Sequence, residues 1–281
     1  MSEQVGPAVR RRQLSRQLHE ARTAAGFATM DAAASATGLS RATISRIESA
    51  KQVILPRTVR LLCQIYGIGS PMLDQMLMLA TESVDDHGWQ AEFAGVVPDW
   101  FERYVGEESD ATQLWVYGAE CVPALLQTDD YCRAVRTAMF PRLNAEGLDR
   151  YVEFRAARAA RLAEKGAPKL HAIINEAVLR RQVGGRAVMR EQLKHLVEVA
   201  AWPNITLQVL PFDSGAHPAM TGSFTMLHFP ASTGVATVFV EVDSAGMYRD
   251  RPADFERYSW IFGQLRDDAL APDASIVTDL D

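Results

Sequence analysis

The sequence predicts a protein of two domains: an all-α N-terminal domain of five helices, followed by a mixed α/β (α+β) C-terminal domain. Residues 1–81 hold consecutive short amphipathic segments with capping residues, whereas apolar, β-branched runs of strand length follow Asp85. The net charge changes sign near the same position. With 281 residues, 48% of them hydrophobic, the chain is long enough to bury a core in each domain.

Each expected N-terminal helix has its own start or stop signal. Thr29, Ser40 and Ser70 are the expected N-caps, while Gly26 and Gly38 end the helices before them. Proline in the first turn marks the start of the last two helices. The expected segments are Arg11–Ala25, Met30–Thr37, a third helix after Ser40, Pro56–Tyr66, and a fifth within "SPMLDQMLMLATES".

The second region combines strands and helices. Its strand candidates are "TQLWVYGAE", "KLHAIINEA", "ITLQVLPF", "SFTMLHF" and "TVFVEVD". Helices are expected over Asn144–Glu164, Arg186–Ala201 and Asp254–Ala269. Because helices separate the early strands and the later strands are adjacent, we expect a domain of mixed α and β structure. The acidic "ESVDDHG" around Ser83 is the expected junction.

An aromatic stripe follows this junction, within "WQAEFAGVVPDWFERYV". The spacing favours a bridging helix that packs on a core, and a partner groove is the alternative. The stripe consists of Trp89, Phe93, Trp100, Phe101 and Tyr104.

Charge is distributed unevenly along the chain. Residues 1–81 contain ten of the 29 basic and five of the 35 acidic residues, a net charge of +5. The whole chain carries −6, so residues 82–281 carry −11. A basic N-terminal third can bind a polyanion while the acidic remainder stays away from it, although a solvated helix surface would look the same.

The segment "GLSRATISRIESAKQ" has the pattern of a helix-turn-helix unit. Gly38 and Leu39 form the turn before the Ser40 cap, and Ile44 and Ile47 point inward. The opposite face is small and basic, which suits entry into the major groove of DNA. That face presents Ala42, Ser45, Arg46 and Ser49, with Arg41 and Thr43 on its flanks.

Together with "LHEARTAAGF" and "LPRTVRLLCQIYGI", this segment resembles the XRE-type (Cro/repressor-like) helix-turn-helix domain over residues 10–82. The resemblance implies that Arg41, Ala42 and Arg46 face bases, and that Thr43 and the start of the second helix hold the DNA backbone. It also implies an internal ion pair between Arg22 and Glu48. The expected DNA-binding residues are Thr29, Met30, Ser40, Arg41, Ala42, Thr43, Ser45, Arg46, Lys51 and Arg57.

Two features depart from that family. Met30 stands where the family usually has a DNA-contacting Gln, and "AKQVILP" has fewer cations than the family's usual segment after the recognition helix. Both departures concern contacts to the DNA backbone more than the fold.

Residues 87–271 are similar to the C-terminal domain of WhiJ-like actinobacterial regulators. The segments that carry the resemblance are "CVPALLQTDDYCRAV", "AVLRRQVGGRAVMREQL", "PNITLQVLPFDSGAHPAMTGSFTMLHF" and "VFVEVDSAGMYRD", in matching order. Such regulators are often encoded beside a small BldB-related protein, in a pairing likened to toxin and antitoxin. The resemblance therefore implies a small co-encoded partner protein.

No catalytic or metal-ligating set stands out. His217 with Glu120, Glu176 or Glu241 lacks the spacing of a metal or acid–base site. "QVGGRAVMREQ" reads as a helix cap, since no Lys-Ser/Thr pair follows to make a nucleotide-binding loop. We expect no enzyme activity, no cofactor and no metal. The cysteines are expected to be reduced and structural, with a reactive thiol at Cys121 or Cys132 as the alternative; they are Cys63, Cys121 and Cys132.

These observations predict a cytoplasmic transcriptional regulator, because neither a signal peptide nor a membrane span is recognisable. We expect a homodimer on double-stranded DNA, and no membrane association. The alternative is a small-ligand sensor or enzyme-like α/β domain whose helix-turn-helix docks on a protein. An apolar stripe on the fifth helix is expected to close the core, with dimerisation as the alternative role; it comprises Met72, Leu73, Met76, Leu77 and Ala80.

Overall fold

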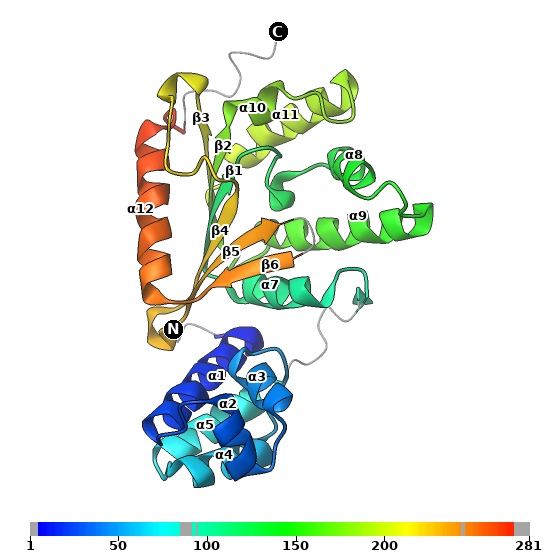
Figure 1. Ribbon diagram of the computed structural model, residues 1–281. Coiled ribbons are helices and arrows are strands. Elements are labelled where there is room, and N and C mark those ends of the chain that lie inside the picture. Colours follow the sequence, from blue (N-terminus) through cyan, green and yellow to red (C-terminus); the bar gives the residue numbers. More distant parts are fainter. Residues whose placement is uncertain (1–4, 85–91, 94, 243–244, 273–281) are drawn as a thin grey trace. The chain divides into compact units, whose positions relative to one another are not determined.

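The computed structural model describes residues 5–84, 92–93, 95–242 and 245–272 (Figure 1). The chain divides into two compact units. The first contains residues 1–88 together with 103–110 and 229–235, and the second contains residues 89–102, 111–228 and 236–281. The fold class is therefore a helical N-terminal region followed by a domain with a mixed sheet and helices, as the sequence predicts.

Five consecutive helices form the N-terminal region. Thr29 and Ser40 cap the second and third, as predicted. The first helix begins earlier than expected, at Pro7, since proline is suited to the first helical position. The bounds are α1 Pro7–Ala24, α2 Met30–Thr37, α3 Arg41–Glu48, α4 Pro56–Tyr66 and α5 Met72–Glu82.

One predicted cap is wrong. The N-cap position of α5 is Pro71, which already has helical dihedral angles and accepts no side-chain cap bond. Ser70 therefore lies one residue too far from the helix to cap it. Most of the apolar stripe on α5 has the predicted core role, because Met76 and Ala80 are buried while Leu73 and Leu77 pack against the same cluster. Met72, in the first turn of the helix, is the exception, since it is exposed.

The core of the first unit lies between these helices. Ile44 and Ile47 of α3 are each 1% exposed, and they join Leu14 and Leu18 of α1 and Leu62 of α4. Burying side chains of this size stabilises the fold by about 1.5–3 kcal/mol each. Because Ile44 and Ile47 are buried, α3 exposes its opposite face.

Long-range polar contacts within the first unit hold α1 in place, and two of them involve α7 (Asp99–Asp110). The backbone N–H of Val9, in the first turn of α1, donates to the Asp110 carboxylate at 3.0 Å. This carboxylate satisfies an N–H group that has no partner within the helix, as an N-cap side chain would. The buried Arg12 guanidinium pairs with the buried Glu107 carboxylate at 3.4 Å.

The sheet of the second unit has the strand order β3-β2-β1-β4-β5-β6. β1 pairs in parallel with β2, and β2 with β3, while the contacts of β4, β5 and β6 are antiparallel. β6 was not expected from the sequence because it is short and no residue of it is buried. The strands are β1 Gln113–Gly118, β2 Lys169–Asn175, β3 Ile205–Leu210, β4 Phe224–His228, β5 Ala236–Val242 and β6 Ala245–Arg249.

Helices lie on both faces of this sheet (Figure 1). The last helix, α12, packs Phe262 and Leu265 against Tyr117, Ile173 and other buried residues of one face, and α9 and α11 lie on the other face. The bounds are α7 Asp99–Asp110, α8 Asp129–Met139, α9 Ala145–Ala160, α10 Glu176–Arg180, α11 Arg186–Ala200 and α12 Pro252–Asp268. Short 3-10 helices cover Ala124–Leu126, Arg161–Ala163, Phe212–Ser214 and Ala231–Thr233.

The aromatic stripe has the predicted core-packing role where the structure describes it. Trp100 stacks on Phe239 of β5, Phe101 meets the same ring edge-on, and Phe93 contacts Phe154 of α9. Trp89 and most of the "ESVDDHG" junction lie outside the described residues.

Candidate nucleic-acid interface

Three residues fix the backbone at the two ends of α2 and at the start of α3. Gly38 ends α2 with a φ of +72°, a conformation that favours glycine. The Thr29 hydroxyl accepts from the N–H of Ala32 at 3.2 Å, and the Ser40 hydroxyl accepts from the N–H of Thr43 at 3.0 Å. Together these features form a helix-turn-helix, with α3 as its second helix.

Eight of the ten predicted DNA-binding residues are exposed. Met30 and Thr43 are half-buried, and Met30 packs in part against the core. Arg57 lies in the first turn of α4, and Lys51 follows α3. The exposed members are Thr29, Ser40, Arg41, Ala42, Ser45, Arg46, Lys51 and Arg57.

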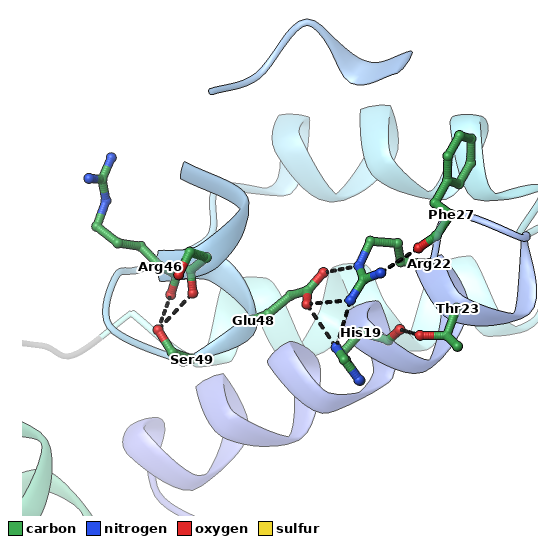
Figure 2. Close-up of polar contacts among 8 residues, drawn as sticks. His19, Arg22, Thr23, Phe27, Arg46, Glu48 and Ser49 are labelled. Carbon is green, nitrogen blue, oxygen red and sulfur yellow. Dashed lines mark hydrogen bonds and ion pairs between the residues drawn. The ribbon is translucent and has the colours of Figure 1, made fainter. Parts of the chain in front are cut away.

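Arg46 extends away from the core of the domain (Figure 2). Its Nε–H donates to the side-chain oxygen of Gln52 at 3.0 Å, and its Nη2 lies 3.4 Å from the Thr43 hydroxyl. Thr43 in turn shares a 2.9 Å hydrogen bond with Ser40. The structure thus brings Ser40, Thr43 and Arg46 into one polar chain, to which Gln52 is added.

Arg41 has a different neighbour. Its Nε lies 3.5 Å from the Asp31 carboxylate in the first turn of α2, and both side chains are exposed. Asp31 was not among the predicted site residues. A carboxylate at the start of α2 lies where the exposed N–H groups of a helix N-terminus would otherwise attract a phosphate.

The predicted ion pair between Arg22 and Glu48 is confirmed (Figure 2). The Nε of Arg22 donates to Glu48 at 2.6 Å and its Nη2 donates to the other carboxylate oxygen at 3.0 Å, while a further N–H reaches the Phe27 carbonyl. His19 Nδ1 lies 2.7 Å from the same carboxylate. The pair ties α1 to the end of α3 and fixes the orientation of the recognition helix.

Burial alone would raise the pKa of Glu48, but hydrogen bonds from Arg22 and His19 outweigh it and hold that pKa below its ordinary value. The same hydrogen bond to Glu48 raises the pKa of Arg22. Both groups are therefore charged at neutral pH, and each neutralises the other inside the domain.

The carboxylates considered as partners for His217 do not gather around it. His217 instead lies beside the Tyr117 hydroxyl, with 3.4 Å between Nε2 and the oxygen. Glu120 pairs with Arg181, and Glu176 pairs with Arg180 and accepts from the N–H of Phe212. Within the described ranges, no three His, Cys, Asp or Glu side chains are placed to hold a metal ion.

The glycines of "QVGGRAVMREQ" occupy a helix start. Gly185 is the N-cap of α11 with a φ of +90°, so the cap interpretation is the one that the geometry supports. Burial raises the pKa of each of the three thiols, which favours the protonated form. The three residues are Cys63, Cys121 and Cys132.

Two family models match the chain. Residues 13–76 match one described as a helix-turn-helix domain, the class that α2, the turn and α3 define. Residues 101–278 match one described as a domain of unknown function (DUF5753), which spans more than half of the chain. The protein therefore belongs to the DUF5753 family. Comparisons with curated proteins and with solved structures found no match.

A search of the part of the chain that the structure describes found no helix long and apolar enough to cross a membrane.

Proposed function

We propose that this protein is a sequence-specific DNA-binding transcriptional regulator that binds double-stranded DNA as a homodimer. One observation carries the proposal: α3 is held by its inner face, and its exposed face presents Arg41 and Arg46 beside small side chains. Small residues let a helix enter the major groove, and arginine is the side chain that most often reads guanine there.

We further propose that the C-terminal domain binds a small protein instead of DNA or a substrate. Residues 82–281 carry −11 and would be repelled by a duplex. The resemblance to WhiJ-like regulators suggests a co-encoded, BldB-related partner in an antitoxin-like pairing. This assignment makes the protein a cytoplasmic regulator without catalytic activity.

Arg46→Ala in the full-length chain tests the DNA-binding function. A duplex selected from random DNA by the wild type serves as the cognate site, and a scrambled duplex serves as the reference. We expect the variant to lose about 1–3 kcal/mol on the cognate duplex and much less on the scrambled one, since a lost base contact matters only where the base is correct. Arg60→Ala, an exposed arginine on α4, is the matched control.

The salt dependence separates this function from the alternative of protein docking. Binding to DNA releases counterions, so the logarithm of the wild-type affinity should fall steeply and linearly with that of the salt concentration. If Arg46 contacts a phosphate instead of a base, Arg46→Ala will weaken both duplexes equally and reduce that slope by about 1. If the wild type selects no duplex at all, the proposed function is wrong.

A further inference from the structure

Gln52 is not among the residues that the helical pattern assigns to DNA. It nevertheless contacts one of them, Arg46. We propose that Gln52 is a positioning residue, which orients the Arg46 guanidinium for reading a guanine. This inference rests on the proposed DNA-binding function and assigns a residue that determines its specificity. Its basis is the 3.0 Å hydrogen bond from Arg46 Nε to the Gln52 side-chain oxygen.

The backbone after α3 brings Gln52 back to Arg46. The N–H of Lys51 donates to the Arg46 carbonyl (2.9 Å) and the N–H of Ala50 donates to the Ile47 carbonyl (3.2 Å). This pair of bonds is a Schellman motif, which reverses the chain at the end of a helix. Ala50 adopts the required left-handed conformation, with a φ of +56°.

Ala50 is an unusual residue for the left-handed position of this turn. Glycine adopts the left-handed conformation at low cost in free energy, whereas for a residue with a Cβ this conformation costs about 1–2 kcal/mol. The buried Ala50 nevertheless adopts the turn conformation, which the two backbone hydrogen bonds close. The turn therefore fixes the half-buried Gln52 beside the last turn of α3.

The contacts of Arg46 leave one side of its guanidinium for a ligand. Gln52 accepts from Nε, and Thr43 lies near Nη2. A guanidinium has five N–H donors in a rigid fork, so holding it by the Nε edge aims the remaining N–H groups in a defined direction. Guanine presents O6 and N7 at a spacing that matches two such donors.

A neutral acceptor is suited to this role. The carboxylate of Glu48 cancels the charge of Arg22, but the amide of Gln52 fixes Arg46 without cancelling its charge. The exposed arginine thus keeps its attraction for a polyanion while it loses rotational freedom before binding. Preorganisation of this kind improves affinity by lowering the entropy lost on association.

Three variants of the full-length protein test the inference. Gln52→Met has a similar length without the acceptor, and Gln52→Glu retains an acceptor. The third, Gln52→Met combined with Arg46→Ala, shows whether the effect depends on Arg46. Affinities are measured for the duplex selected by the wild type and for a scrambled duplex, with thermal unfolding as the check on folding.

We expect Gln52→Met to lower the cognate-to-scrambled affinity ratio by about two- to tenfold, the range for one lost hydrogen bond. Gln52→Glu should keep the ratio while it weakens binding to both duplexes through charge repulsion. In the Arg46→Ala background, Gln52→Met should change nothing further. Selection with Gln52→Met should also lose the preference for guanine at a single position.

Two results would overturn the inference. An unchanged ratio in Gln52→Met would show that Arg46 needs no positioning. An equal loss with and without Arg46 would show that Gln52 contacts DNA directly. Failure of the proposed function is a separate outcome, because the wild type would then prefer no duplex over the scrambled one.

Discussion

Two arginines of the helix-turn-helix region differ in burial and in the charge of their partners. Arg22 is 4% exposed and its guanidinium is paired with the Glu48 carboxylate, whereas Arg46 is exposed and held by the uncharged Gln52. A buried charge must be paired with an opposite charge, because leaving it unpaired costs several kcal/mol. An exposed charge is solvated by water and can remain available to a ligand. Stability and DNA recognition are thus assigned to different arginines, Arg22 of α1 and Arg46 of α3.

The largest expected effect comes from breaking the inner pair. Glu48→Ala leaves the Arg22 guanidinium buried without its carboxylate, and we expect a loss of about 3–5 kcal/mol in the stability of the region. Hydrogen exchange of the amides in α1 and α3, measured on the full-length chain, reports this region separately from the second unit. His19→Ala is the control, since His19 contacts the same carboxylate from an exposed position.

The hydrogen-exchange measurement on Glu48→Ala can contradict the structural role of the Arg22–Glu48 ion pair. If Glu48→Ala leaves amide protection unchanged and alters only DNA affinity, Arg22 and Glu48 belong to the DNA interface. The inner and outer arginines would then share one function.

The stability of the inner pair should depend on pH through the Glu48 carboxylate. The pKa of Glu48 is lower in the folded protein than its ordinary value of 4.5, so the folded state favours the charged form. Its contribution to stability is therefore present at neutral pH and above the unfolded pKa, and is lost as the pH falls through the folded pKa.

Unfolding of the wild type and of Glu48→Gln, followed from pH 7 downwards, measures this contribution. We expect the stability difference between the two proteins to shrink as the pH falls below the ordinary carboxylate range. A difference that stays constant down to low pH would show that Glu48 acts through packing instead of charge.

The two arginines also show what the sequence can and cannot reveal. The caps Thr29 and Ser40 follow from local chemistry, and the partner of Arg22 follows from the family resemblance. The contact between Gln52 and Arg46 does not, because it joins residues six apart across a turn that a helical wheel does not describe. That turn needs a left-handed residue, and its sequence has Ala50 where glycine would be the usual signal.

In the second unit, too, some elements can be predicted from the sequence and others cannot. Its five buried strands are visible as apolar, β-branched runs, but the exposed β6 is not. β6 depends on its pairing with β5, a contact between strands that composition does not encode. Likewise, His217 meets Tyr117 across 100 residues of sequence, a contact that no spacing in the sequence indicates.

The smallest expected effect concerns Arg41, the second outer arginine. Its Nε is 3.5 Å from Asp31, and both side chains are about 70% exposed, so the ion pair itself adds little stability. Asp31 nevertheless places a negative charge beside the start of α2, where DNA phosphates are expected. We therefore expect Asp31→Asn to tighten binding to cognate and scrambled duplexes alike, by about 0.2–1 kcal/mol at low salt, because it removes a repulsion that does not depend on the base sequence.

Asp74→Asn removes the same charge from the first turn of α5 and provides the matched control. It should change neither affinity, since α5 carries none of the predicted DNA contacts. A loss of affinity for Asp31→Asn on the cognate duplex alone would give Arg41 the same positioned role as Arg46, with Asp31 in the place of Gln52. An equal gain on both duplexes, lost at high salt, would instead show that the two outer arginines are controlled differently: Arg46 by orientation, and Arg41 by local charge.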